Sequence, residues 1–247
     1  MNGKKLVIIH TSFVSVEALG ELCRELLPGV EVRNIVDDSL LPEVMANSGP
    51  TSGVVQRITA YARLAESLGA DVILNQCSSV GEAADQAAAA TGVPYLKIDQ
   101  PMAERAVQLG ERIAVVATVA STLGPSCRLV TSAAQRAGKE VEVIPCLVDG
   151  ALEVLMQEKN REKHNRMVKE KIEAVQDKAD VIVLAQGSMI VLLPELGHIT
   201  RPVLTSPRLG VERVREMLLG TDQAPLADGL KSELSAAGSE DTTRHTA

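Results

Sequence analysis

Residues Ala70 to Ser79 read ADVILNQCSS, and this stretch decides the predicted fold. The apolar run over 72–74 is short, which suits one strand that is buried on both faces. Small polar residues follow it, with a single thiol at Cys77, and helical composition resumes over 82–90. In open parallel sheets, ligands bind just outside the carboxyl ends of the strands. We therefore expect Cys77 to face a bound small molecule.

The same stretch recurs at 179–188 as ADVIVLAQGS, 109 residues further on, which makes Gln186 the counterpart of Cys77. Two further segments repeat, LVIIHTS at 6–12 with IAVVATV at 113–119, and EVRNIVDD at 31–38 with EVIPCLVD at 142–149. The chain therefore reads as two copies of one α/β unit.

The pattern of apolar runs and turn residues places the remaining elements. Strands are expected over 6–9, 31–36, 72–74, 93–98, 112–117, 141–147, 181–185 and 202–205. Helices are expected over 16–27, from Thr51 or Ser52 to 68, over 82–90 and 101–109, from Gly124 and Pro125 onward, over 151–178 and over 210–219. The segment that ends in NSGPTSG at 47–53 reads as a loop, either a plain connector or a flexible cover.

This layout predicts the division of the chain into domains. Residues 1–104 together with 207–220 are expected to form a first α/β lobe, and residues 105–206 a second one. The small, polar residues 221–247 predict a disordered tail.

Composition limits the possible partners. The chain has 247 residues, of which 45% are hydrophobic but only 1% aromatic, so the core must consist of aliphatic side chains. Scarce aromatic residues argue against binding of single-stranded nucleic acid, which uses stacking platforms. The formal net charge of −7 argues against a nucleic-acid phosphate footprint, which needs clustered cations.

The sequence also bears on location. No apolar run approaches the roughly 20 residues that cross a bilayer, so no membrane partner is expected. The N-terminus MNGKKLVIIH fits a first core strand better than a signal peptide. Four cysteines without a CxxC pair indicate a reduced, cytoplasmic protein.

Hydroxyl side chains recur at the predicted strand ends. They are Ser12, Ser78, Ser79, Thr118, Ser121, Thr122 and Ser188. Each lies where a helix can begin, and helix N-termini offer unpaired N–H groups and a partial positive charge that attract carboxylates. The alternative is that these residues only cap helices. Their recurrence at corresponding strand ends favours a carboxylate-binding cluster.

Four motifs stand in order between residues 5 and 218: NQCSSVGEA, PYLKIDQPMAERAV, RIAVVATVAST and ADVIVLAQGSM. Together they resemble the aspartate/glutamate/hydantoin racemase superfamily. The resemblance implies two flavodoxin-like parallel-sheet lobes related by pseudo-twofold symmetry, with a cleft between them. It also implies cysteine acid/base chemistry beside a substrate carboxylate without a cofactor, neither a metal nor pyridoxal phosphate.

The chain departs from the superfamily at one position. Two-base racemases of this superfamily place a cysteine on each face of the substrate, and Cys77 matches the first. The position of the second cysteine falls on Gln186, or on Gly187 in a shifted alignment, and neither residue can exchange a proton as a thiol does. Arylmalonate decarboxylase, another member, also works with a single catalytic cysteine, on the opposite side. We expect one base, or a different second group.

Few side chains are candidates for that second group. His10, at the end of the first strand, would lie near the cleft and titrates near neutral pH, with a structural role as the alternative. Lys97 and Asp99 lie at another strand end, although Lys97 can instead pair with a surface carboxylate. His164 is expected to face inward, because it falls on a ridge of residues spaced by four. The ridge consists of Leu152, Met156, Asn160, His164, Val168 and Ile172.

The leading hypothesis is a racemase or isomerase that acts, without a cofactor, on the carbon next to a carboxylate of a small acid. Cys77 is expected to work as a thiolate, since helix N-termini lower thiol pKa values. The hydroxyls at the strand ends, with Gln186 and Gly187, would bind the substrate and stabilise the enediolate. The alternatives are a malonate-type decarboxylase, in which Cys77 protonates the enediolate, and a non-catalytic small-acid binder. The sequence leaves open whether the protein forms a homo-oligomer.

Overall fold

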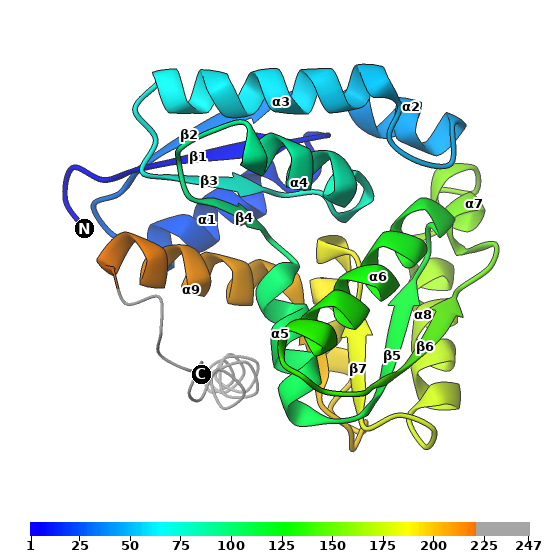
Figure 1. Ribbon diagram of the computed structural model, residues 1–247. Coiled ribbons are helices and arrows are strands. Elements are labelled where there is room, and N and C mark those ends of the chain that lie inside the picture. The colour runs from blue at the N-terminus through cyan, green and yellow to red at the C-terminus, as the bar shows by residue number, and fades with distance from the viewer. Residues whose placement is uncertain (221–247) are drawn as a thin grey trace, which may run out of the picture.

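The computed structural model describes residues 1–220, which form two lobes, each built on a four-stranded parallel sheet (Figure 1). The first sheet has the order β2-β1-β3-β4, with β1 Lys5–His10, β2 Glu31–Val36, β3 Val72–Asn75 and β4 Tyr95–Lys97. The second sheet has the order β6-β5-β7-β8, with β5 Arg112–Ala117, β6 Glu142–Leu147, β7 Val181–Leu184 and β8 Val203–Thr205.

Helices join these strands in both lobes. They are α1 Val16–Leu26, α2 Leu40–Ala46, α3 Ser52–Ser67, α4 Gly81–Ala89, α5 Gln100–Leu109, α6 Ala120–Arg136, α7 Ala151–Met156, α8 Arg161–Val175 and α9 Ser206–Leu219. Two 3₁₀ helices, η1 Ser78–Val80 and η2 Gly187–Glu195, follow β3 and β7.

The two sheets repeat each other in register, and the expected α/β fold with two parallel-sheet lobes is confirmed. Leu6 pairs with Val72 in the first sheet, and Ile113 pairs with Val181 in the second. These are the positions that the sequence repeat equates. The central strands are buried on both faces, as their continuous apolar runs predict.

The aspartate of the ADVI motif has the same structural role in both lobes. Asp71 accepts the backbone N–H of Lys5 at 2.8 Å, and Asp180 accepts the backbone N–H of Arg112 at 2.9 Å. Each contact ties the start of one central strand to the start of its neighbour, so the repeated aspartates set the register of the sheets.

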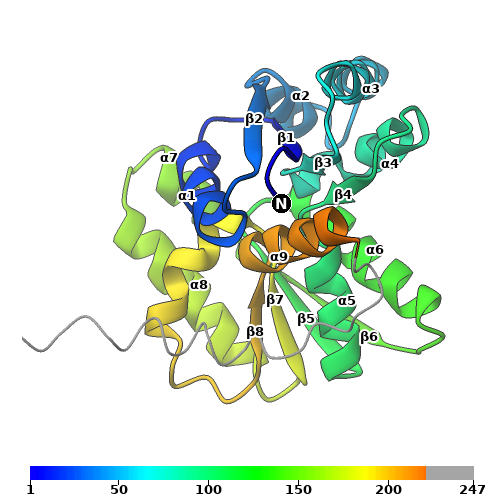
Figure 2. The ribbon, with the colours of Figure 1, turned by 90° about the vertical axis from the view of Figure 1, so that its left-hand side faces the viewer.

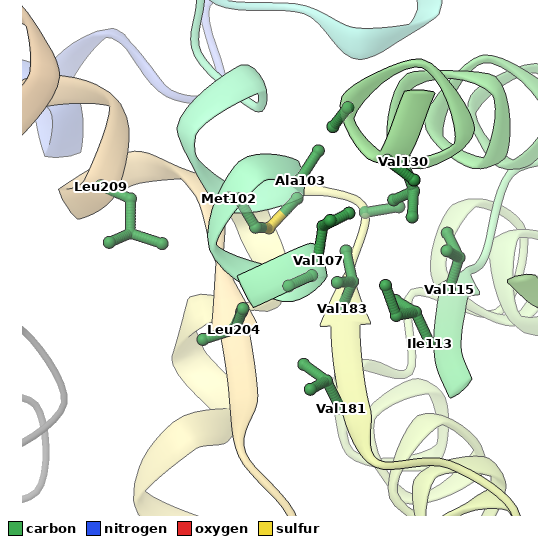
Figure 3. Packing of buried hydrophobic residues seen from close by; sticks show 14 of the residues in the cluster. Met102, Ala103, Val107, Ile113, Val115, Val130, Val181, Val183, Leu204 and Leu209 are labelled. Atoms are coloured by element: carbon green, nitrogen blue, oxygen red, sulfur yellow. The ribbon is translucent and has the colours of Figure 1, made fainter. Parts of the chain in front are cut away.

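The chain crosses between the lobes twice, through α5 between β4 and β5 and again from β8 into α9. Helix α5 packs in the second lobe, where Met102 and Val107 join the hydrophobic cluster that contains Val183 (Figure 3). Helix α9 returns to the first lobe and lies beside α1 (Figure 2), with Val211 and Val214 buried in the cluster beneath the first sheet. The two lobes therefore exchange helices.

Several segments differ from the expected layout, among them α9, which begins at Ser206 rather than at residue 210. The expected loop before Thr51 contains α2, because Leu40 and Val44, spaced by four, bury one helical face. Helix α6 begins at Ala120, so Pro125 lies inside it and removes one backbone hydrogen bond. The single charged helix expected over 151–178 is two helices, α7 and α8.

The break between α7 and α8 changes the expected ridge of spacing four. Lys159 adopts a positive φ of 52°, and the Asn160 side chain accepts the backbone N–H of Lys163 at 2.9 Å to begin α8. Of that ridge, Val168 and Ile172 are buried within α8, while Met156 is exposed. The ridge therefore does not run unbroken through this region.

The described residues contain no helix that is both long and apolar enough to cross a membrane. The tail expected over 221–247 lies outside the described residues, and the residue bounds expected for the two lobes stay a prediction.

Candidate active site

Cys77 lies two residues beyond the end of β3, where it precedes the 3₁₀ helix η1, and its side chain is half-buried. The side-chain amide of Asn75 donates to the Cys77 backbone carbonyl at 3.0 Å. Asn75 is itself buried in the sheet. The backbone that carries the thiol is therefore fixed by a side chain of the strand that precedes it.

Burial raises the pKa of the Cys77 thiol above its ordinary value. Hydrogen bonds from the Thr11 hydroxyl and from the backbone N–H and hydroxyl of Ser79 act in the opposite direction, and the charge of Asp99 raises the pKa further. The sequence predicts a lowered pKa from the helix N-terminus alone. The structure shows that loss of hydration outweighs the local donors, so the resting thiol is protonated at neutral pH.

Gln186 occupies the position in the second lobe that Cys77 occupies in the first. Each residue precedes a 3₁₀ helix with an extended backbone, at φ −115° and ψ 119° for Cys77 and φ −120° and ψ 127° for Gln186. Thr118 donates its backbone N–H to Gln186 Oε1 at 2.7 Å, and Gln186 Nε2 lies 3.0 Å from Thr118 Oγ1. The repeat equates Thr118 with Thr11, so each lobe pairs a threonine with the residue beyond its central strand.

Two of the expected substrate-binding hydroxyls contact each other across the lobes. Ser79 Oγ lies 3.0 Å from Thr122 Oγ1, and both side chains are buried. Ser78 Oγ lies 3.5 Å from the carbonyl oxygen of Ala185, also in the second lobe. The structure thus brings the segment after Cys77 against the start of α6 and the end of β7.

A groove of about 310 Å³ opens beside this contact, between α2 of the first lobe and the strand ends of the second. Its lining residues are Met45, Ser48, Thr118, Val119, Ala120, Ser121, Leu147, Val148, Asp149, Gly150, Leu152 and Glu153. Thr118 and Ser121 are therefore brought to one groove, and the buried Ser121 hydroxyl has no partner within the described residues. Cys77 is not among the lining residues.

The other expected binding residues are spread around these contacts. Ser12 is half-buried after β1, and Ser188 is exposed at the start of η2. A Cβ atom added at Gly187 would lie 3.3 Å from Pro207 Cγ, so the backbone of η2 approaches the start of α9 closely. Among the described residues, no hydrogen bond joins Ser12 or Ser188 to Cys77.

His10 is fully buried at the end of β1, and its Nε2 lies 2.9 Å from Asn34 Oδ1 on the edge strand. Burial lowers the pKa of this imidazole, so it is neutral at pH 7. Side chains alternate along a strand, which puts His10 on the same face as Ile8, toward α1. Cys77 packs against the cluster on the opposite face. Among the described residues, no hydrogen bond joins His10 to the Cys77 thiol. The expected acid/base role of His10 stays a prediction.

A family model for Asp/Glu/hydantoin racemases matches residues 6–214. The chain belongs to this family. No curated protein sequence matches it significantly.

Solved structures of two racemases and of one decarboxylase share the fold of this racemase-family chain. Glutamate racemase from Francisella tularensis, in complex with D-glutamate, gives a TM-score of 0.69 at 10% identity, with 92% of this chain and 86% of that chain covered. Allantoin racemase from Klebsiella pneumoniae gives a TM-score of 0.62 at 18% identity, with 94% of this chain and 99% of that chain covered. A liganded variant of arylmalonate decarboxylase gives a TM-score of 0.54 at 16% identity, with 98% of this chain and 96% of that chain covered. At these identities the likeness establishes the fold alone.

Sequence reasoning missed two contributors to the site of this racemase-family chain. The first is Thr11, whose hydroxyl donates to the Cys77 thiol. The repeat could have indicated it, since Thr118 is its counterpart in the second lobe. Asn75 orients the Cys77 backbone, and only its polar character inside an apolar strand signals that role. Within residues 1–220, no group of three or more His, Cys, Asp or Glu side chains is arranged to hold a metal ion.

Proposed function

We propose that this protein is a racemase or isomerase that moves a proton at the carbon next to a carboxylate of a small acid, with Cys77 as the acid/base and no cofactor. One observation carries the proposal: a half-buried thiol lies at the carboxyl end of a central strand, among hydroxyl and N–H donors, beside the contact between the lobes. Family membership supports racemase-like chemistry, and the small carboxylate-bearing substrate is part of the proposal.

The proposed reaction needs proton transfer and charge stabilisation. Cys77 exchanges one proton with the α-carbon, and negative charge then develops on the carboxylate oxygens as an enediolate forms. Thr118 and Ser121 line the adjacent groove, and the Ser121 hydroxyl, which has no partner within the described residues, supplies a donor without adding charge. Donors that are fixed before the reaction stabilise such an anion strongly, because they do not have to reorganise.

A decarboxylase of a malonate-type acid is the second candidate, and Gln186 favours it. The two-base form of racemisation requires a proton-exchanging group on each face of the carbon, but an amide neither gives nor takes a proton near neutral pH. In a decarboxylation, one carboxylate leaves as carbon dioxide and a single acid protonates the enediolate. A protonated Cys77 thiol suits that step. Non-catalytic binding of a small acid is the third outcome to test.

Proton NMR in deuterium oxide separates these functions. The protein would be incubated with single enantiomers of amino, hydroxy and hydantoin-type acids and with substituted malonates. Exchange of the α-proton with loss of optical purity supports the racemase, and release of carbon dioxide with one-face deuteration supports the decarboxylase. Binding by calorimetry without either reaction supports the binder.

Cys77→Ser is the decisive variant, and Cys127→Ser is its matched control because Cys127 is also a half-buried free thiol. We expect Cys77→Ser to lower turnover by about 10²–10⁴-fold, the range for loss of a general acid or base. Cys127→Ser should keep the wild-type rate. Full activity in Cys77→Ser would refute the proposed chemistry in both enzymatic forms.

A further inference from the structure

The groove between α2 and the strand ends of the second lobe carries charges of one sign. Asp149 and Glu153 are the only charged residues in its described lining. Both are exposed, and neither side chain makes an ion pair or a hydrogen bond with another residue of 1–220. The groove therefore holds two negative charges without a positive partner from the part of the chain that the structure describes.

The start of α6 forms a neighbouring wall of the same groove. Strands β5 and β6 are adjacent, with Ala117 paired with Leu147, so α6 and Asp149 follow neighbouring strand ends. The N-cap of α6 is Val119, whose side chain accepts no hydrogen bond, so the first N–H groups of this helix have no side-chain acceptor. These groups and the helix dipole favour a negative group. One wall of the groove thus suits an anion and the other suits a cation.

The first lobe shows what a pair of carboxylates binds at this kind of connection. Helix α2 begins four residues after β2 ends, as α7 does after β6, so the two helices are counterparts. Beside α2, the carboxylates of Asp37 and Glu43 both bind the guanidinium of Arg57, the first at 3.3 Å. In the first lobe the chain supplies this cation itself. Beside α7, no described residue supplies one, and the carboxylates face the groove instead.

We propose that this groove binds a positively charged end of the substrate, and that the substrate is a small acid with an ammonium or guanidinium group at its far end. The inference rests on the proposed function, which places the substrate carboxylate beside the start of α6. Asp149 and Glu153 attract the cationic end and repel a second carboxylate. The groove therefore selects against dicarboxylic acids.

The test compares three acids of equal length that differ only at the far end. They are δ-aminovalerate, valerate and glutarate, whose far ends are cationic, apolar and anionic. NMR titration of each acid into the wild-type protein would measure its affinity at low ionic strength, where exposed charges act most strongly. We expect δ-aminovalerate to bind about tenfold more tightly than glutarate, because two exposed carboxylates each contribute modestly. High salt should reduce the difference.

A double variant, Asp149→Asn with Glu153→Gln, makes the result specific. It should bind δ-aminovalerate about fivefold more weakly and glutarate more tightly, while the affinity for valerate stays within about twofold. Misfolding would instead weaken the binding of all three acids. The matched control is Glu140→Gln with Asp177→Asn, which removes the same charge from exposed positions that precede β6 and β7. It should keep all three affinities, because these positions lie at the opposite edge of the second sheet.

Three results would overturn the proposal: equal affinities of the three acids in wild type, no measurable binding of δ-aminovalerate, or a preference for it that survives in the double variant. The test is separable from the proposed function because it needs no turnover. If Cys77→Ser retains turnover, the acid/base role fails, whereas the charge preference of the groove still stands. If Cys77 proves essential but glutarate binds best, only the assignment of the cationic end fails.

Discussion

Thr118 donates its backbone N–H to Gln186 Oε1 over 2.7 Å, at the place in the second lobe that repeats Thr11 and Cys77 in the first. The hydroxyl of Thr118 lies within 3.2 Å of the same oxygen, and Gln186 Nε2 lies 3.0 Å from that hydroxyl. Both ends of the amide are therefore engaged. Gln186 is a fixed amide in a position where its counterpart carries a thiol.

Replacing Gln186 by leucine should destabilise the protein. The change leaves the buried N–H of Thr118 without its acceptor, and a buried unpaired donor costs about 1–3 kcal/mol. Urea unfolding of Gln186→Leu measures this loss. Gln135→Leu on the exposed face of α6 is the control and should stay within about 0.5 kcal/mol of wild type. Equal stabilities of the two variants would contradict the prediction.

The contact between Ser79 and Thr122 should couple the two lobes energetically. The two hydroxyls are 3.0 Å apart and buried, so Ser79→Ala and Thr122→Val should each cost about 1–3 kcal/mol. The double variant should cost less than the sum of the two, because the second change removes a group that the first has already left unpaired. A thermodynamic cycle from four urea curves measures the difference.

Ser67→Ala serves as the control for that cycle. Its hydroxyl is exposed and donates to the Leu64 carbonyl within the same helix, so the change should cost under about 0.5 kcal/mol. Strictly additive effects of Ser79→Ala and Thr122→Val would show that the two hydroxyls do not stabilise one another.

The sheets could be predicted from the sequence because their signals are local and repeated. The bounds of β2 and β5 are those expected, and the aspartates at 71 and 180 recur because each ties two strands together. The counterpart of Cys77 also followed from the repeat, since a constant separation between two halves fixes equivalent positions whatever their chemistry.

The electrostatics and the inter-lobe contacts could not be predicted in this way. The pKa of Cys77 depends on how much water the folded chain excludes, and that depends on residues distant in sequence. The repeat equates Ser79 with Ser188, but it does not reveal that Ser79 contacts Thr122. The break before Asn160 depends on one positive φ angle at a lysine, which the composition of that charged segment does not signal.

The buried thiol of Cys23 should make the protein sensitive to alkali. Burial between α1 and the first sheet raises its pKa to about 11, above the ordinary value of 9.0. The folded state therefore favours the protonated thiol, and its full stabilising effect is present below pH 9. That effect is lost progressively as the pH rises from 9 through 11, and it amounts to about 3 kcal/mol for a shift of this size.

Urea unfolding of Cys23→Ala as a function of pH measures this effect. The variant should be less stable at pH 7, because it leaves a small cavity, but its stability should fall less steeply between pH 9 and 11. The difference in slope isolates Cys23 from the other buried groups that titrate in this range. Parallel curves for wild type and Cys23→Ala would contradict the assignment.

Gly210 should be required for α9 to pack against the end of β4. A Cβ atom at this position would lie 2.6 Å from Ile98 Cγ1 and 2.8 Å from the Ile98 carbonyl oxygen. Alanine normally stabilises a helix by up to about 1 kcal/mol relative to glycine. Here the overlap should reverse the sign, so that Gly210→Ala costs about 1–3 kcal/mol. Gly197→Ala, with open space around its Cβ position, is the control and should be neutral or slightly stabilising.

The two contacts of Gly210 also predict how a second change behaves. Shortening Ile98 to alanine removes the Cγ1 atom but leaves the carbonyl oxygen in place, so the Ile98→Ala background should not restore the stability of Gly210→Ala. Urea unfolding of the double variant measures this. Full recovery would show that only the flexible side chain opposed the new methyl group. Persistent loss would show that the backbone at the end of β4 sets the distance of α9, one residue before Asp99.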